Sequence, residues 1–165
     1  ALDCNVSRLK TVEENCRRSG VNNVEVAAGD ILSVRNRGWE KSFHLVVLDP
    51  PCSSLGIIRR HPDIKWRRSK KEISGLAENQ RRMIQCAADL ARPGGRLVYS
   101  VCTTTREEGE DVIRDFLSRR TDFCLELEIP APGWEIFFEK GMFRTYPHRH
   151  GMDGFFSARF KRTSG

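Results

Sequence analysis

The chain has 165 residues, of which 39% are hydrophobic and 30% are charged, so it is long enough for one hydrophobic core and polar enough to be soluble. No apolar run reaches the ~20 residues that a membrane span needs, and there is no signal peptide, so we expect a cytoplasmic protein with no membrane partner. Six cysteines without a Cys-x-x-Cys pair favour a reducing compartment and predict neither a bound metal nor a disulfide framework.

Predicted strands and helices alternate along the chain. Ser69 and Glu72 have the spacing of a capping box at the start of one helix, and Thr105 and Glu108 repeat that spacing at the start of another. Strands are expected at residues 1–3, 24–28, 44–49, 96–102, 123–127 and 155–160, and helices at 6–19, 70–91 and 105–119. This alternation predicts an α/β fold with a largely parallel sheet.

The most informative stretch is the predicted strand at 44–49 and the turn after it. Its run of four apolar residues predicts a strand that is buried on both faces. The strand ends on Asp49, and two prolines then direct the chain into a stiff turn that carries Cys52. Because ligands bind at the carboxyl edge of open α/β sheets, this turn is a candidate site. The alternative is a solvated acid and a core cysteine.

Four predicted strands end on side chains with useful chemistry, namely Asp3, Asp30, Asp49 and Cys102. In a parallel sheet these ends lie along one edge. Asp3 could accept hydrogen bonds from ribose hydroxyls and Asp30 from an adenine amino group, although both could instead cap a helix or a loop. Cys102 is expected near a helix N-terminus, whose dipole would lower its pKa; the alternative is an inert buried thiol.

Residues 59–71 contain seven Lys and Arg residues and one Asp, whereas the rest of the chain balances 21 basic against 21 acidic residues. This basic segment also contains Trp66. Phosphate contacts need positive charge and base stacking needs an aromatic ring, so the segment predicts contact with nucleic acid. The alternative is an ordinary solvated surface.

Five motifs occur in a characteristic order: DPPCS at 49–53, IRRHPDIKW at 58–66, PGG at 93–95, VYSVCT at 98–103 and DGFF at 153–156. Together they resemble the Sun/Fmu family of S-adenosylmethionine-dependent RNA cytosine-5 methyltransferases, most closely its bacterial 16S rRNA branch. The resemblance implies a Rossmann-like methyltransferase sheet, S-adenosylmethionine as cofactor and RNA, specifically ribosomal RNA, as partner.

The resemblance also implies roles for individual residues. Cys102 would attack carbon 6 of cytosine, Cys52 would assist product release, and Asp49 would hold the cytosine edge. Cofactor-binding residues would be Asp3, Arg8, Asp30 and Asp49. RNA-binding residues, which would hold the backbone beside an extruded base, would be Arg59, Arg60, His61, Lys65 and Trp66.

One departure from the family pattern is large, because the glycine-rich cofactor loop and the first, central strand before it are absent. That strand would lie between the strands that end at Asp3 and Asp49. We therefore expect residues 1–165 to be the catalytic domain of a longer enzyme, truncated at its amino end. Two strand edges would be left unpaired, which favours closure of the gap, rearrangement or self-association with a second copy.

Two alternatives belong to other functional classes. Amino-group methyltransferases also use an Asp-Pro-Pro turn, usually with an aromatic residue where this chain has Cys52, and they need no thiol. A non-catalytic RNA-binding fragment would need only the fold and the basic segment, and the absent cofactor loop favours it. A zinc protein is a weaker alternative because His148 and His150 lie near no suitable cysteine pair.

Overall fold

The computed structural model describes residues 1–164, with the backbone alone for residues 35 and 36. The chain divides into two compact units, one at Ala1–Trp39 and one from Glu40 onward, and each is described by itself. None of the helices in residues 1–164 combines the length and hydrophobicity that crossing a membrane requires.

The first unit is a small parallel βαβ arrangement followed by a 3-10 helix. It contains β1 (Leu2–Asp3), α1 (Val6–Arg18), β2 (Ala27–Ala28) and η1 (Ile31–Arg37), and β1 pairs with β2 in parallel. The Asn5 side chain accepts hydrogen bonds from the backbone of residues 7 and 8 and so begins α1, close to the predicted start. The predicted strand at 24–28 is shorter than expected, at two residues.

The second unit contains a six-stranded mixed sheet. The strand order is β3-β4-β8-β7-β6, in which only β3 and β4 are parallel to each other. β5 pairs with the carboxyl-terminal part of β8, whereas β7 pairs with its amino-terminal part. The α/β class is confirmed. The expectation of a largely parallel sheet is wrong, because β4 pairs on its other side with β8, which runs antiparallel to it. The strands are β3 (Phe43–Leu48), β4 (Ala91–Val101), β5 (Phe123–Leu125), β6 (Phe138–Glu139), β7 (Met142–Thr145) and β8 (Phe155–Arg162).

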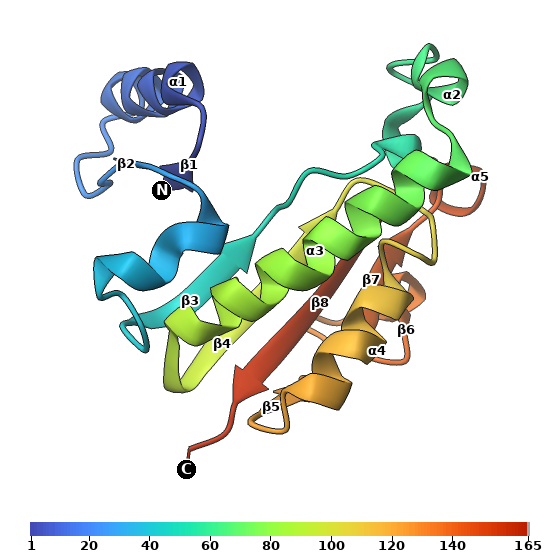
Figure 1. Ribbon diagram of the computed structural model, residues 1–165. Helices are drawn as coiled ribbons and strands as arrows, with labels where there is room; N and C mark the ends of the chain where they lie inside the picture. The colour runs from blue at the N-terminus through green and yellow to red at the C-terminus, as the bar shows by residue number, and fades with distance from the viewer. Residues whose placement is uncertain (165) are drawn as a thin grey trace. The chain divides into compact units, whose positions relative to one another are not determined.

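Two long helices cover one face of this sheet, as Figure 1 shows. They are α3 (Lys70–Leu90), which contacts β3 and β4, and α4 (Glu110–Arg119). The predicted capping box at the start of α3 is present, since Ser69 and Glu72 exchange side-chain and backbone hydrogen bonds. In α4, Phe116 packs against Phe160 of β8 with ring centroids 4.9 Å apart. The shorter helices are η2 (Leu55–Ile57), α2 (Ile64–Arg67), η3 (Glu135–Phe137) and α5 (Pro147–His150).

The capping box predicted for the next helix is wrong. The helix α4 begins at Glu110 after Gly109, and no side chain caps it. Thr105 and Glu108 do hydrogen-bond to each other, but through their side chains, with the Thr105 hydroxyl donating to Glu108 at 2.9 Å. Glu108 cannot reach back to a cap because its carboxylate points into the interior, where other donors bind it.

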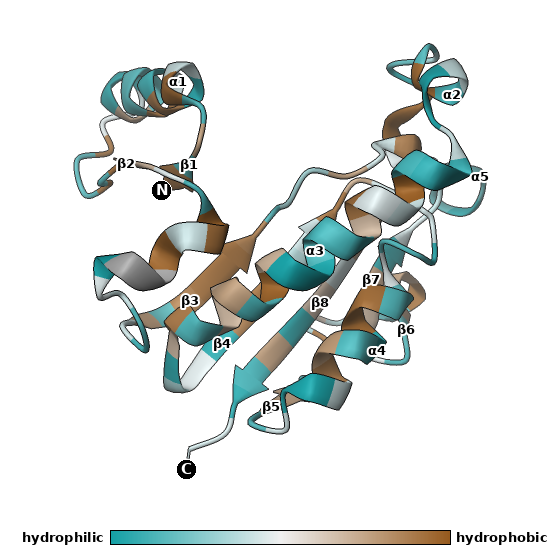
Figure 2. Ribbon diagram, in the orientation of Figure 1, coloured by the Kyte–Doolittle hydropathy of each residue, from teal (hydrophilic) through white to brown (hydrophobic). Residues whose placement is uncertain are grey.

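The prediction that the strand at 44–49 is buried on both faces is also wrong. Leu45 and Val47 are 53% and 64% exposed, whereas Leu48 is buried. Alternate residues of a strand face opposite sides, and α3 covers only one of them. Figure 2 shows the hydrophobic character of β3. In the described part of the chain β1 pairs with β2 and β3 pairs with β4, in separate sheets, so the expected closure is not achieved by pairing β1 with β3.

Candidate active site

The parallel pairing of β3 and β4 assembles the candidate site in the second unit. Leu48 is in register with Tyr99, so both strands reach their carboxyl ends at the same edge of the sheet. Asp49 and its Pro-Pro turn leave β3 there, and Cys102 directly follows β4. The arrangement places an acid and two thiol-bearing turns at the edge where α/β sheets bind ligands.

The two cysteines approach each other closely. Cys52 Sγ lies 3.3 Å from Cys102 Sγ, and the Ser54 hydroxyl lies 3.6 Å from the Cys102 sulfur. Both cysteines are half-buried and neither is in a disulfide. Ser54 adopts a left-handed backbone conformation with φ of 60°, which turns the chain sharply after Cys52. The geometry therefore places two free thiols side by side with a hydroxyl next to them.

The pair has one acidic and one weakly acidic thiol. Hydrogen bonding with Cys52, and secondarily with Ser54, lowers the pKa of Cys102 to about 6, against burial and the negative charge of Asp49. The same hydrogen bond, together with burial, raises the pKa of Cys52. Cys102 is thus the more acidic of the two thiols. The predicted lowering of the Cys102 pKa is confirmed, but its expected source at a helix end is wrong, because α4 begins only at Glu110.

Asp49 belongs to the same edge. The residue is exposed, but neighbouring groups partly shield its carboxyl from water, and this desolvation raises the pKa of the carboxyl above the usual value. Its charge acts on Cys102 and opposes the thiolate, so the two groups lie within electrostatic reach of each other. An acid whose pKa is raised is better able to share a proton with a basic nitrogen of a ligand.

The basic segment 59–71 begins just after this site. All five of its predicted RNA-binding side chains are exposed, and Trp66 is 83% exposed. The Lys65 ammonium lies 5.2 Å from the centre of the Trp66 ring. Arg68 donates to the Ser53 carbonyl at 3.1 Å, which ties the segment to the turn of Cys52.

A second tie connects the basic segment to the chain before β8. Arg60 Nε donates to Asp153 Oδ2 at 2.5 Å, and Arg59 donates to the Gly151 carbonyl at 2.7 Å. Asp153 is only 12% exposed, so its carboxylate is a fixed anchor rather than a mobile surface charge. Sequence reasoning did not find this anchor, although Asp153 begins the DGFF motif.

In the first unit, two of the predicted cofactor-binding acids come together. Asp3 ends β1 and the register of the two strands places Ala28 opposite it, with Asp30 two residues further on. Asp3 accepts a hydrogen bond from the Asn5 backbone, which with the nearby charge of Arg8 holds its pKa below the usual range. Asp30 accepts from the Leu32 backbone at 2.9 Å. Both acids therefore also act as caps, as the alternative reading expected.

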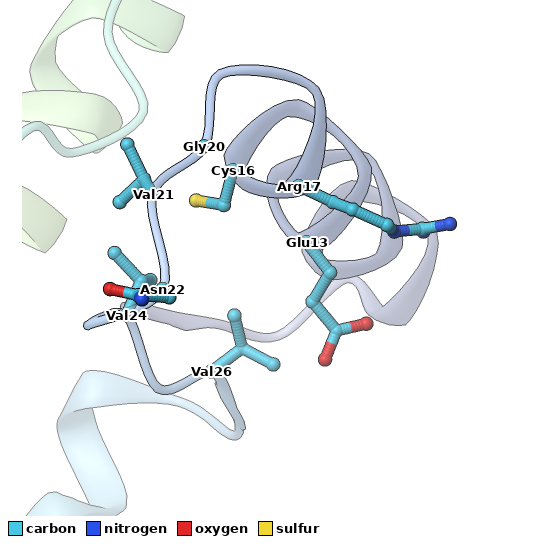
Figure 3. A pocket seen from close by; sticks show the side chains of 8 residues that line it. All are labelled: Glu13, Cys16, Arg17, Gly20, Val21, Asn22, Val24 and Val26. Carbon is cyan, nitrogen blue, oxygen red and sulfur yellow. The ribbon is translucent and has the colours of Figure 1, made fainter.

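The hollow shown in Figure 3 also belongs to the first unit, between α1 and the segment before β2. It has a volume of about 350 Å³, and Cys16 of α1 points into it toward Val21. Neither Asp3 nor Asp30 lines it, so it does not coincide with the predicted cofactor-binding acids. Within residues 1–164 no group of three or more His, Cys, Asp or Glu side chains is arranged to hold a metal ion.

Comparison with known proteins decides the family. The profile of the family described as 16S rRNA methyltransferase RsmB/F matches residues 1–161. The chain belongs to this family. The resemblance to Sun/Fmu methyltransferases inferred from the five motifs is thereby confirmed.

Two curated relatives of this RsmB/F chain are named Ribosomal RNA small subunit methyltransferase B. The protein from Shewanella oneidensis is 35% identical over 99% of the chain and 37% of its own length. The protein from Vibrio cholerae is 38% identical over 96% of the chain and 34% of its own length. The chain therefore spans about a third of the curated relatives that it matches.

Solved structures support the same assignment. NSun6 from Pyrococcus horikoshii, solved with SFG, is 33% identical, with a TM-score of 0.78 over 100% of the chain and 41% of that protein. A methyltransferase homologue from the same organism is 29% identical, with a TM-score of 0.78 over 98% of the chain and 52% of that protein. The Rossmann-like methyltransferase fold is thus confirmed.

Proposed function

We propose that this chain is the catalytic domain of a longer, cytoplasmic enzyme that transfers a methyl group to carbon 5 of a cytosine in ribosomal RNA. The observation that carries the proposal is the 3.3 Å approach of the Cys52 and Cys102 sulfurs beside Asp49. An amino-group methyltransferase needs no thiol, and an RNA-binding fragment has no use for a thiolate. A pair of thiols with opposite pKa shifts suits a reaction in which one attacks and the other handles a proton.

The Cys102 thiolate would form a bond to carbon 6 of the ring and push electrons toward carbon 5. Asp49, with its raised pKa, would hold the N3 and amino edge and share a proton with it as the sulfur adds. After methylation, a solvent base would remove the carbon 5 proton, and the electron pair of that bond would re-form the double bond between carbons 5 and 6 and expel the Cys102 sulfur, while N3 returns its proton to Asp49. Cys52 would assist this release, and Cys102 leaves as a thiolate again.

S-adenosylmethionine would supply the electrophilic methyl group from its sulfonium and would leave as a neutral thioether. NSun6 was solved with SFG, an analogue of this cofactor. Asp3 and Asp30 fit the role of binding it, because they lie at the same edge of the β1–β2 pair and each carboxylate has acceptor capacity beyond its backbone cap. Arg8, 3.6 Å from Asp3, would orient that carboxylate.

The basic segment would bind the RNA backbone. Its exposed charges next to the Cys52 turn suit phosphate contacts, and the exposed Trp66 ring suits stacking on a base. Replacing Lys65 with Ala should reduce the salt dependence of RNA binding by about one counterion. Arg82→Ala, an equal change of charge on the exposed side of α3, should leave it unaltered.

The deciding experiment uses the full-length protein, ribosomal RNA and radiolabelled cofactor. We expect Cys102→Ala to abolish methyl transfer and Cys52→Ala to accumulate a covalent RNA adduct that survives denaturing electrophoresis. Cys124→Ala, on β5, removes a thiol away from the two cysteine turns and should change neither result. Full activity in Cys102→Ala would favour an amino-group methyltransferase, and RNA binding without any transfer would favour a non-catalytic RNA-binding protein.

A further inference from the structure

Glu108 is a buried acid that the proposed chemistry does not use. Its side chain has no exposed surface, and all three of its hydrogen bonds are accepted from neutral donors. Oε1 accepts from the Ser53 backbone N–H at 2.8 Å and from Gln80 Nε2 at 3.0 Å, and Oε2 accepts from the Thr105 hydroxyl at 2.9 Å. A buried carboxylate is strongly unfavourable unless hydrogen bonds satisfy it, so filling space alone would not favour an acid here.

These hydrogen bonds connect Glu108 to the turns that carry both cysteines. Ser53 directly follows Cys52, so the bond from its backbone to Glu108 fixes the turn that carries that thiol. Thr103 directly follows Cys102, and its hydroxyl lies 2.9 Å from the Ser53 hydroxyl. Ser53 and Thr103 are themselves fully buried, which keeps these contacts away from the bulk solvent. The two turns therefore meet in one buried hydrogen-bonded cluster.

Two further residues complete the cluster. The Thr105 hydroxyl donates to Glu108. The Thr105 backbone N–H donates to the Thr103 hydroxyl at 3.3 Å. Gln80, fully buried on α3, uses its other amide hydrogen to donate to the Pro51 carbonyl at 2.9 Å. Glu108 is thus the point where α3, the turn after β3 and the turn after β4 are joined.

We propose that Glu108 is a positioning residue that holds the turns of Cys52 and Cys102 at the spacing the two thiols need. This inference rests on the proposed function for its purpose, but the geometry itself is measurable without methyl transfer. Glu108 does not touch the sulfurs; it acts through Ser53 on one side and through Thr105 and Thr103 on the other.

The spacing of the Cys52 and Cys102 thiols is tested in the full-length protein by the rate at which an oxidant links them as a disulfide. The oxidant is diamide, which accepts two electrons and two protons from a pair of thiols. The thiols become a disulfide and the azo bond of diamide becomes a hydrazine. The rate at which the peptide containing a Cys52–Cys102 disulfide appears is followed by mass spectrometry. The pH midpoint of Cys102 alkylation by iodoacetamide provides a second reading of the hydrogen bond from Cys52.

We expect Glu108→Gln to slow disulfide formation by about tenfold, because the amide places hydrogens where a carboxylate oxygen accepted them. The alkylation midpoint of Cys102 should rise at the same time. The matched control is Glu107→Gln, which changes an exposed neighbouring acid and should leave both readings at the wild-type values. Wild-type trapping and an unchanged midpoint in a folded Glu108→Gln protein would overturn the proposal.

A milder variant keeps the test decisive if Glu108→Gln does not fold. Thr105→Val removes one donor to Glu108 and keeps the shape of the side chain, so trapping should slow in the same direction but less. Unchanged trapping in a folded Thr105→Val protein would overturn the proposal as well. The proposed function fails separately: if Cys102→Ala retains methyl transfer, the trapping rates still decide the role of Glu108.

Discussion

Gly56 and Gly154 contact each other backbone to backbone, with no side chain between them. The Gly154 N–H donates to the Gly56 carbonyl at 2.8 Å, and the Gly56 N–H donates to the Cys102 carbonyl at 3.0 Å. This contact brings the turn of Cys52, the end of β4 and the residues before β8 to one point. A Cβ atom added to Gly56 would collide with the Gly154 carbonyl oxygen.

We therefore predict that Gly56→Ala destabilises the protein by about 1–3 kcal/mol, since the backbone must move to relieve the overlap. Chemical denaturation of the two proteins measures the change. Gly75→Ala is the matched control: Gly75 is exposed in α3 with open space around its Cα, so alanine should stabilise the helix by about 0.5–1 kcal/mol. Equal stabilities of the two variants would contradict the proposed close contact.

A second prediction concerns the pH dependence of Cys102. Because its pKa is lowered to about 6, the thiolate is lost only as the pH falls through that value. The rate of alkylation at Cys102 should therefore be nearly constant above pH 7 and decrease below about pH 6. Cys52→Ala removes the main donor, so the midpoint should move up toward about 8.5.

Mass spectrometry of the Cys102 peptide after brief exposure to iodoacetamide at each pH measures this midpoint. Cys16→Ala, in the first unit, removes a thiol that lines the hollow of Figure 3 and should leave the midpoint in place. A midpoint that is the same with and without Cys52 would show that the two sulfurs do not share a hydrogen bond.

The sequence was most informative where local signals determine structure. Ser69 and Glu72 define the start of α3 through neighbouring groups, and the prolines after Asp49 stop β3 whatever surrounds them. The meeting of Cys52 and Cys102 followed from parallel pairing alone, since both lie just beyond the carboxyl ends of adjacent strands. The first two features need no knowledge of distant residues, and the third needs only the pairing of two strands.

The predictions failed where distant residues decide. Thr105 and Glu108 have a helix-capping pattern, but the donors at Ser53 and Gln80 bind the carboxylate instead. The apolar run of β3 predicts burial on both faces, yet burial requires a second covering layer that the described residues do not place over Val47. The acidity of Cys102 was expected from a helix end, whereas a thiol 50 residues away in sequence supplies it.

A third prediction separates anchoring from simple charge in the basic segment. Asp153→Asn removes a negative charge, which by electrostatics alone should strengthen RNA binding. Because Asp153 anchors Arg60 and lies 3.6 Å from Arg59, we expect instead that affinity falls by about threefold as the segment loosens. Filter binding of ribosomal RNA at fixed salt measures the change.

The control for this prediction is Asp63→Asn, which removes the same charge within the basic segment. Asp63 is 54% exposed and, among the described residues, its ion pair is with Arg67 of the short helix α2, at 3.2 Å. Its replacement should therefore leave affinity unchanged or slightly higher. If both variants strengthen binding alike, the contacts of Asp153 do not position the segment for RNA.

The last prediction concerns self-association of the 165-residue chain. The strand β3 pairs with β4 along one edge, and its exposed Leu45 and Val47 side chains lie on the face that α3 does not cover. An accessible hydrophobic strand edge favours pairing between molecules, so we expect dimers or larger species at high protein concentration.

Val47→Lys should shift the chain toward monomer, because a charged side chain there opposes pairing. Sedimentation equilibrium measures both masses, with Val6→Lys, at an exposed position of α1, as the control. A wild-type chain that stays monomeric while retaining its secondary structure would contradict this prediction.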